Sequence, residues 1–149
     1  MSEKLKVLIL CTANSARSQM GEGLLRHLAG DTIEVYSAGA KPSSVNPFAI
    51  QAMSERGIDI TSHSSDHLRQ YLDTAFDFVM TVCDNAAENC PVFPGPAQRI
   101  HWSFTDPAAA VGDDAAVLRS FIDVRNGLEV KLLDWLRTVI QSHCFPTTT

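Results

Sequence analysis

The sequence lacks any hydrophobic run long enough to cross a membrane and any cluster of basic residues. Its first apolar run, residues 5–10, is followed at once by polar residues, so we expect neither a signal peptide nor a membrane span and expect the protein to be cytoplasmic. Twelve Lys and Arg residues against seventeen Asp and Glu residues give a formal charge of -5. This balance argues against nucleic acid as a partner. An anionic substrate would have to be held by local hydrogen-bond donors.

Internal repeats and low-complexity tracts are also lacking, apart from a short run of threonines at the C-terminus. The chain has 149 residues, of which 45% are hydrophobic. These values are typical of one globular domain with a single core. We expect one domain, residues 1–149, that acts as a monomer, with residues 144–149 as a frayed tail.

Apolar patterns typical of strands and of helices alternate along the chain. Asn46-Pro47 and Gly57 are typical of the start and the end of a helix. The predicted strands cover residues 5–10, 33–37, 76–82 and 98–102, and the predicted helices cover residues 18–28, 46–57 and 114–140. This alternation predicts an α/β fold with a four-stranded parallel sheet and helices on both faces.

Four cysteines are present. In a reducing compartment, cysteines are more often catalytic, metal-binding or simply buried than paired in a structural disulfide framework. Ligands of open parallel sheets bind beyond the carboxyl ends of the strands, and Cys11, Cys83 and Cys90 all follow predicted strands. Their spacing is poor for a zinc site. The five histidines show no mutual spacing that demands a metal, so we expect them to be surface or locally hydrogen-bonded residues.

The segment after the first predicted strand has a cysteine and an arginine separated by five small or polar residues. A loop of this length can turn successive backbone N–H groups toward one tetrahedral oxyanion, while the following helix directs its positive end at the same point. Arg17 could donate two hydrogen bonds to such an anion. In that field Cys11 is expected to be the nucleophilic thiolate, with a hydrogen bond from Ser18. The predicted oxyanion cradle consists of Thr12, Ala13, Asn14, Ser15, Ala16 and Arg17.

Several motifs together resemble the low-molecular-weight tyrosine phosphatase superfamily over nearly the whole chain. They are Cys11-x5-Arg17-Ser18 after the first strand, Ser37-Ala38-Gly39 after the second, and a late Asp106-Pro107. Within that superfamily the sequence resembles the thioredoxin-coupled arsenate reductases, because two further cysteines after the third strand are not a phosphatase feature. This second resemblance is carried by Asn14, Ser18-Gln19-Met20-x-Glu22-Gly23, Cys83-x6-Cys90-Pro91, His101-Trp102 and Asp106-Pro107.

The resemblance implies a role for each site residue. Cys11 would be the nucleophile, Arg17 the oxyanion clamp, Ser18 a stabiliser of the thiolate, and Asp106 the acid that protonates a leaving oxygen. It also implies arsenate as substrate, thioredoxin as reductant and no organic cofactor. Some members bind potassium, at positions that correspond here to Asn14, Glu22, Ser37, Ser64 and Asp66. The family residue at position 64 is often Thr, and Ala16 stands where family loops often carry another cysteine.

The additional thiols would make this loop a reductase. Cys11 attacks arsenic, and Asp106 gives a proton so that water leaves. Cys83 then attacks the Cys11 sulfur, two electrons pass to arsenic and arsenite departs, leaving a disulfide between the two cysteines. Cys90 attacks Cys83 and frees Cys11, provided that the polar segment 84–89 rearranges. We expect this segment to unfold locally on oxidation and to expose the final disulfide to thioredoxin.

Two other functions stay open. The same loop could belong to a tyrosine phosphatase, for which Trp102 and Phe104 are the only candidate aromatic residues near Asp106. Alternatively, the cysteines could form a non-enzymatic thiol switch, although such a switch needs no leaving-group acid.

Some of these residues also have purely structural alternatives. Cys11 and Arg17 could be a buried cysteine and an exposed helix residue, and Cys83 and Cys90 could be unrelated thiols. Asp106 could be a turn former or a helix cap. Cys144 is expected to be a non-catalytic thiol in the tail.

Overall fold

A computed structural model of the chain describes residues 4–84 and 91–142. Four parallel strands form one sheet in the order β2-β1-β3-β4. The strands are β1 (Leu5–Cys11), β2 (Ile33–Gly39), β3 (Phe78–Thr81) and β4 (Gln98–His101). The predicted α/β fold with a four-stranded parallel sheet is therefore confirmed. Cys90, Cys144 and the predicted frayed tail lie outside the described residues.

Strand β3 is shorter than the predicted strand 76–82. Asp77 N donates to Lys6 O at 2.8 Å, and Lys6 N donates to the Asp77 side chain at 2.8 Å rather than to a backbone carbonyl. Because a side chain takes the place of the backbone acceptor here, regular pairing starts only at Phe78, opposite Val7.

The described residues also form three α-helices and two one-turn 3-10 helices. They are α1 (Arg17–Ala29), α2 (Pro47–Glu55), η1 (Leu68–Tyr71), η2 (Pro107–Ala109) and α3 (Asp114–Ser142), of which η2 and α3 follow the last strand. Helix α2 begins where Asn46 Oδ1 accepts a hydrogen bond from Phe48 N at 2.8 Å. It is followed by Gly57 at a φ of 83°, a conformation in which glycine is favoured. Neither 3-10 helix was predicted from the sequence.

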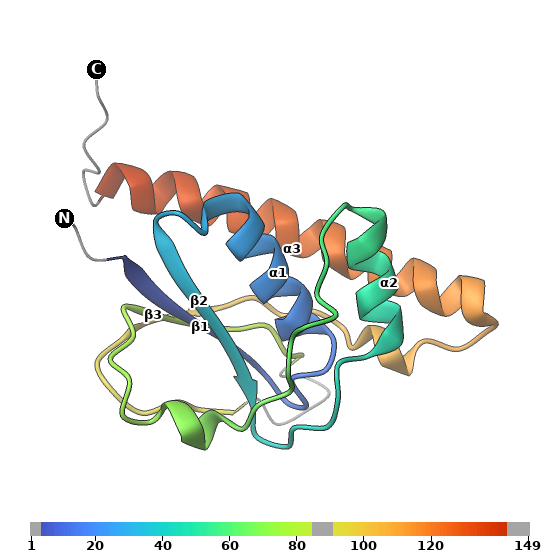
Figure 1. Cartoon of the computed structure of the whole chain (residues 1–149), viewed down its shortest axis with the longest axis horizontal. Helices are drawn as coiled ribbons and strands as arrows, with labels where there is room; N and C mark the ends of the chain where they lie inside the picture. The colour runs from blue at the N-terminus through green and yellow to red at the C-terminus, as the bar shows by residue number, and fades with distance from the viewer. Residues whose placement is uncertain (1–3, 85–90, 143–149) are drawn as a thin grey trace.

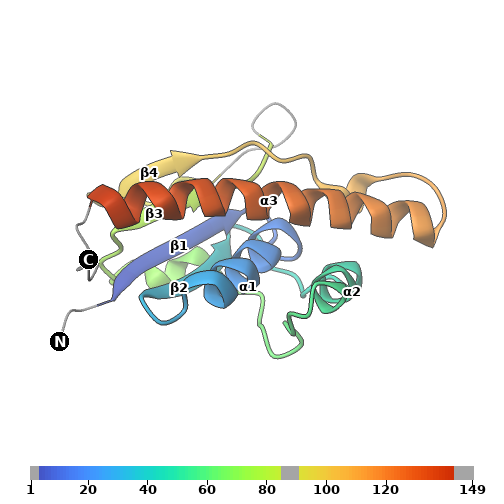
Figure 2. The same cartoon turned by 90° about the horizontal axis from the view of Figure 1, so that it is seen from above.

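The α-helices pack together over one face of the sheet, where α3 contacts both α1 and α2 (Figures 1 and 2). The second face is covered by η1 and by coil. An aromatic cluster fills the space there: Tyr36, Tyr71, Phe76 and Phe93. The connection from β2 to β3 passes through α2 and then through η1, so the helix expected on the second face is only one turn long.

The carboxyl ends of three neighbouring strands, at Cys11, Gly39 and Thr81, lie at the same edge of the sheet. In parallel sheets this is the edge at which ligands bind, and it carries the candidate active site. Among the helices that the structure describes, none is both long and apolar enough to cross a membrane.

Candidate active site

The loop between β1 and α1, residues 11–17, turns its carbonyl oxygens away from its interior. The carbonyls of residues 12–16 each accept a hydrogen bond from another segment or from the following helix. The donors are Lys41 N (2.9 Å to Thr12 O), Ser43 N (3.3 Å to Ala13 O), Gln19 Nε2 (3.0 Å to Asn14 O), Asn46 N (2.9 Å to Ser15 O) and Met20 N (2.9 Å to Ala16 O). The C=O and N–H groups of a trans peptide point in opposite directions, so the N–H groups of residues 13–17 face inward. Inward N–H groups of this kind can bind an oxyanion.

Arg17 is the first residue of α1 and is only 4% exposed. The alternative of an exposed helix residue is therefore wrong. Its Nη1 donates to the carbonyl oxygen of Phe104 at 2.9 Å, which restricts the plane of the guanidinium. The guanidinium charge and the positive end of α1 both add to the attraction for an anion at this edge.

Cys11 is a free thiol at the end of β1 and is 2% exposed. Its Sγ lies 3.0 Å from Ser18 Oγ. Because Ser18 Oγ accepts a hydrogen bond from Asn14 Nδ2 at 2.8 Å, its own hydrogen can point at the sulfur and stabilise a negative charge there. The Asn14 amide is itself oriented by Asp66 N, which donates to Asn14 Oδ1 at 2.8 Å.

The backbone of the loop approaches the end of β2 closely at Gly39. A Cβ at this position would lie 2.5 Å from Thr12 O and 2.8 Å from Asn14 N. Any side chain here would therefore push against the backbone of the loop. The Ser-Ala-Gly motif thus has a steric reason for its glycine.

The predicted acid, Asp106, lies two residues beyond Phe104, so the segment that carries it adjoins the loop through Arg17. Asp106 Oδ1 accepts a hydrogen bond from Ala108 N at 3.0 Å and caps η2. The alternative role of Asp106 as a helix cap is therefore confirmed for one of its two carboxyl oxygens. Since a carboxyl group has two oxygens, capping and proton donation are compatible.

Cys83 is fully buried and belongs to the same core cluster as Cys11. It follows β3, the neighbour of β1 in the sheet. Cys83 is disulfide-bonded, whereas Cys11 is a free thiol, so the bond of Cys83 does not involve Cys11. The third predicted cysteine, Cys90, lies outside the described residues.

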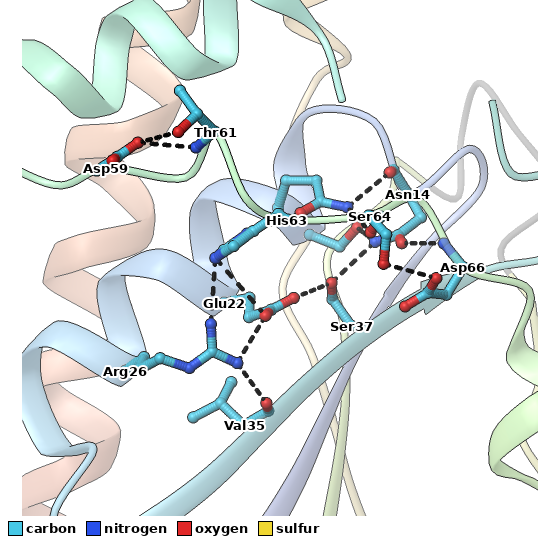
Figure 3. Close-up of polar contacts among 12 residues, drawn as sticks. Asn14, Glu22, Arg26, Val35, Ser37, Asp59, Thr61, His63, Ser64 and Asp66 are labelled. Carbon is cyan, nitrogen blue, oxygen red and sulfur yellow. Dashed lines mark hydrogen bonds and ion pairs between the residues drawn. The ribbon is translucent and has the colours of Figure 1, made fainter. Parts of the chain in front are cut away.

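Four of the five residues predicted to bind potassium line one cavity of about 280 Å³: Glu22, Ser37, Ser64 and Asp66. The fifth, Asn14, donates to Ser37 Oγ at 3.0 Å. Ser37 Oγ in turn donates to Glu22 Oε1 at 2.5 Å, and Ser64 Oγ donates to Asp66 Oδ1 at 2.9 Å (Figure 3). The four residues that line the cavity offer oxygens, which are the ligands that hard cations prefer, whereas Asn14 turns its Nδ2 toward Ser37.

Two side chains that the sequence did not single out, Arg26 and His63, complete this cluster (Figure 3). Arg26 Nη2 lies 2.7 Å from Glu22 Oε2 and donates to Val35 O at 2.8 Å. The Nε2 atom of His63 is 3.1 Å from Arg26 Nη1. Burial is the main cause that lowers the pKa of His63, and Arg26 adds to it against the opposing effect of Glu22. His63 is therefore favoured in its neutral form.

Gln19 connects this cluster to the loop. Its Oε1 lies 3.0 Å from His63 Nδ1, and its Nε2 donates to Asn14 O at 3.0 Å and to Ser64 O at 2.8 Å. Gln19 is fully buried. Its only sequence signal was its place in the Ser18-Gln19-Met20 motif, because a helical pattern does not show which polar residue turns inward.

Comparisons with known proteins agree with this geometry. The family model described as low molecular weight phosphotyrosine protein phosphatase matches residues 6–143. A protein named arsenate reductase from Shouchella clausii (strain KSM-K16) is 42% identical over 138 residues, which cover 93% of this chain and 99% of the relative. A solved arsenate reductase in a phosphate-binding state aligns with a TM-score of 0.74 and 32% identity, over 91% of this chain and 98% of that one. A thioredoxin-dependent arsenate reductase from Corynebacterium glutamicum aligns with a TM-score of 0.72 and 26% identity, over 95% of this chain and 64% of that one.

The fold and the Cys-x5-Arg loop define a protein of the phosphotyrosine phosphatase type. The chain belongs to the low molecular weight phosphotyrosine protein phosphatase family, and within that family its relatives are the arsenate reductases.

Proposed function

We propose that this protein is an enzyme that reduces arsenate to arsenite through a relay of Cys11, Cys83 and Cys90. The observation that carries the proposal is the free Cys11 thiol at the start of a loop whose N–H groups face inward. This thiol is hydrogen-bonded to the Ser18 hydroxyl. Arsenate is a tetrahedral oxyanion like phosphate. The similar arsenate reductase solved in a phosphate-binding state supports this use of the loop.

In the first step the Cys11 thiolate attacks arsenic, forming a sulfur–arsenic bond and breaking an arsenic–oxygen bond. Asp106 supplies a proton, so the leaving oxygen departs as water. Cys83 is disulfide-bonded in this structure, so the thiol reductant must first reduce that bond; Cys83 then attacks Cys11 Sγ as a thiolate. A disulfide forms, the electron pair of the sulfur–arsenic bond moves to arsenic, and As(V) leaves as As(III) in arsenite.

The register of β1 and β3 supports transfer to Cys83. Leu10 lies opposite Thr81, and Val82 N still donates to Leu10 O at 2.9 Å. Cys83 is then one residue beyond the position opposite Cys11. Strand β3 ends at Thr81, so regular strand spacing does not extend to Cys83, but Cys83 lies in the same buried cluster as Cys11.

Recycling requires Cys90 to attack Cys83 and a thiol reductant to reduce the resulting disulfide. Thioredoxin is the reductant we propose, since a similar protein is a thioredoxin-dependent arsenate reductase. A relay that ends in reduction by a thiol carrier suits a reducing compartment such as the cytoplasm.

Phosphatase activity at the same loop is the second candidate, because the family model that matches is that of a phosphotyrosine protein phosphatase. In that reaction water, rather than Cys83, would attack the covalent intermediate. The loop geometry serves both reactions, so the two functions are distinguished by the cysteines after β3.

Potassium is a further part of the proposal. The oxygens of Asn14, Glu22, Ser37, Ser64 and Asp66 would hold it. Its charge would neutralise Glu22 and stabilise the Asn14 side of the loop. Arg26 already provides one positive charge to Glu22 at 2.7 Å, so we expect the cation to modulate turnover rather than to be required for it.

The test is arsenate-dependent NADPH consumption with thioredoxin and thioredoxin reductase. Cys11→Ser, Cys83→Ser and Cys90→Ser should each abolish turnover, and Cys144→Ser should not. Loss in Cys11→Ser alone, with hydrolysis of aryl phosphates, would show a phosphatase instead. Replacing potassium chloride with choline chloride tests the cation proposal, because wild type should slow and Glu22→Gln should not respond.

A further inference from the structure

Helix α3 carries a glycine, Gly127, in its interior, although glycine is one of the least favourable residues there. The ring of Phe104 occupies the space that a side chain would need. A Cβ at position 127 would lie 2.9 Å from Phe104 Cε1 and 3.8 Å from both Cδ1 and Cζ. Gly127 therefore forms a notch in α3 that admits the ring, and Phe104 packs there against the main core.

The backbone of Phe104 also holds Arg17, the arginine of the loop, in place. Phe104 O accepts the hydrogen bond from Arg17 Nη1 at 2.9 Å, across 87 residues of sequence. A guanidinium is a rigid plane, so fixing one of its N–H groups fixes the direction of the others. Since Arg17 is almost fully buried, few other orientations are open to it.

We propose that Phe104 is a positioning residue for oxyanion binding, held in place by the notch at Gly127. The ring fixes the backbone at position 104, the carbonyl orients the Arg17 guanidinium beside the loop, and Asp106 follows two residues later. The contact between the ring and α3 also gives Phe104 a use other than stacking on an aryl substrate. The inference depends on the proposed function only for the identity of the anion, because any tetrahedral oxyanion would use the same guanidinium.

The test is Gly127→Ala, with inorganic phosphate as the binding probe and arsenate as the substrate. The added methyl must displace the Phe104 ring and with it the carbonyl that orients Arg17. We expect the dissociation constant for phosphate and the KM for arsenate to rise about tenfold, as for loss of one hydrogen bond to a charged group, and kcat to change less. Alanine favours a helix more than glycine does, so weaker binding would not be explained by a weakened α3.

Two further variants separate positioning from general overpacking. Gly127→Ala combined with Phe104→Leu removes the clash but keeps the carbonyl, and it should recover most of the phosphate affinity. Gly23→Ala creates an equally close clash, 2.8 Å from side-chain atoms of Ile60 and Met53, away from Phe104. It should lower stability without the tenfold change in phosphate affinity.

Equal weakening of phosphate binding in the two glycine variants, or none in Gly127→Ala, would overturn the positioning role. The outcome is independent of the proposed function. If phosphate binding responds as expected but wild type does not reduce arsenate, the reductase proposal fails and the positioning role stands.

Discussion

Cys11 and Ser18 form the side-chain contact on which the proposed chemistry depends. Both lie in one short segment after a strand, and their contact at 3.0 Å joins residues only seven positions apart. His63 and Gln19, in contrast, are 44 positions apart and meet only because the fold brings them together. The expectation that His63 is a surface or locally hydrogen-bonded residue was wrong, because its side chain is only 9% exposed and its partners Gln19 and Arg26 lie 44 and 37 positions away.

The buried position of His63 predicts a pH dependence of stability. Its folded-state pKa is below the usual value of about 6.5. The unfolded chain therefore binds a proton that the folded chain does not, and the free energy of unfolding should fall as pH drops below about 6.5. Above that pH the contribution of His63 to the free energy of unfolding is fully present. His63→Asn should remove this part of the pH dependence in urea denaturation.

Other groups titrate in both proteins. The quantity to compare is therefore the difference between the unfolding free energies of wild type and His63→Asn at each pH. Asn keeps a polar group near Gln19, so the contact with the loop is largely retained. The same loss of stability between neutral and mildly acidic pH in both proteins would show that His63 is not the group responsible.

The end of β2 packs directly against the backbone of the loop after β1, so a side chain added at the end of β2 should disturb the site. Gly39→Ala would place a methyl within 2.9 Å of three backbone atoms of the loop, in Thr12, Asn14 and Cys11. We expect phosphate affinity and the rate of arsenate reduction to fall by about tenfold or more, because the inward N–H groups would lose their alignment. Isothermal titration with phosphate measures this directly.

Gly21→Ala is the matched control for that experiment. Its Cβ would meet the Ile9 side chain at 3.4 Å, an ordinary contact. This variant should bind phosphate nearly as well as wild type. If Gly39→Ala also bound phosphate normally, the close approach of the two elements would not matter to the site.

At the element scale, the sequence predicted each strand and each α-helix that the structure describes. Burial imposes an apolar pattern on most of them, whereas β4 is largely exposed and has no such pattern. Helices η1 and η2 were not predicted, since a single turn is too short to show a period. The start of β3 was misplaced by two residues because Asp77 bonds Lys6 through its side chain. That substitution of a side chain for a backbone acceptor leaves no trace in a pattern of hydropathy.

At the scale of the whole molecule, the alternation of strands and helices was enough to predict the fold class. The strand order β2-β1-β3-β4 was not predicted, although it is what makes Cys11 and Cys83 neighbours. Sequence order places these cysteines far apart, and only the pairing of β1 with β3 brings the two strand ends together. The same topology brings Phe104 to Arg17 and so joins the segment before α3 to the loop.

The central claim is that Cys11 transfers two electrons to arsenate and becomes part of a disulfide. The most direct test is a single turnover of fully reduced protein with arsenate and no reductant, followed by measurement of arsenite and of free thiols. We predict one arsenite per protein and a fall from the four thiols of the chain to two. No arsenite and an unchanged thiol count, in protein that still hydrolyses an aryl phosphate, would contradict the reductase account.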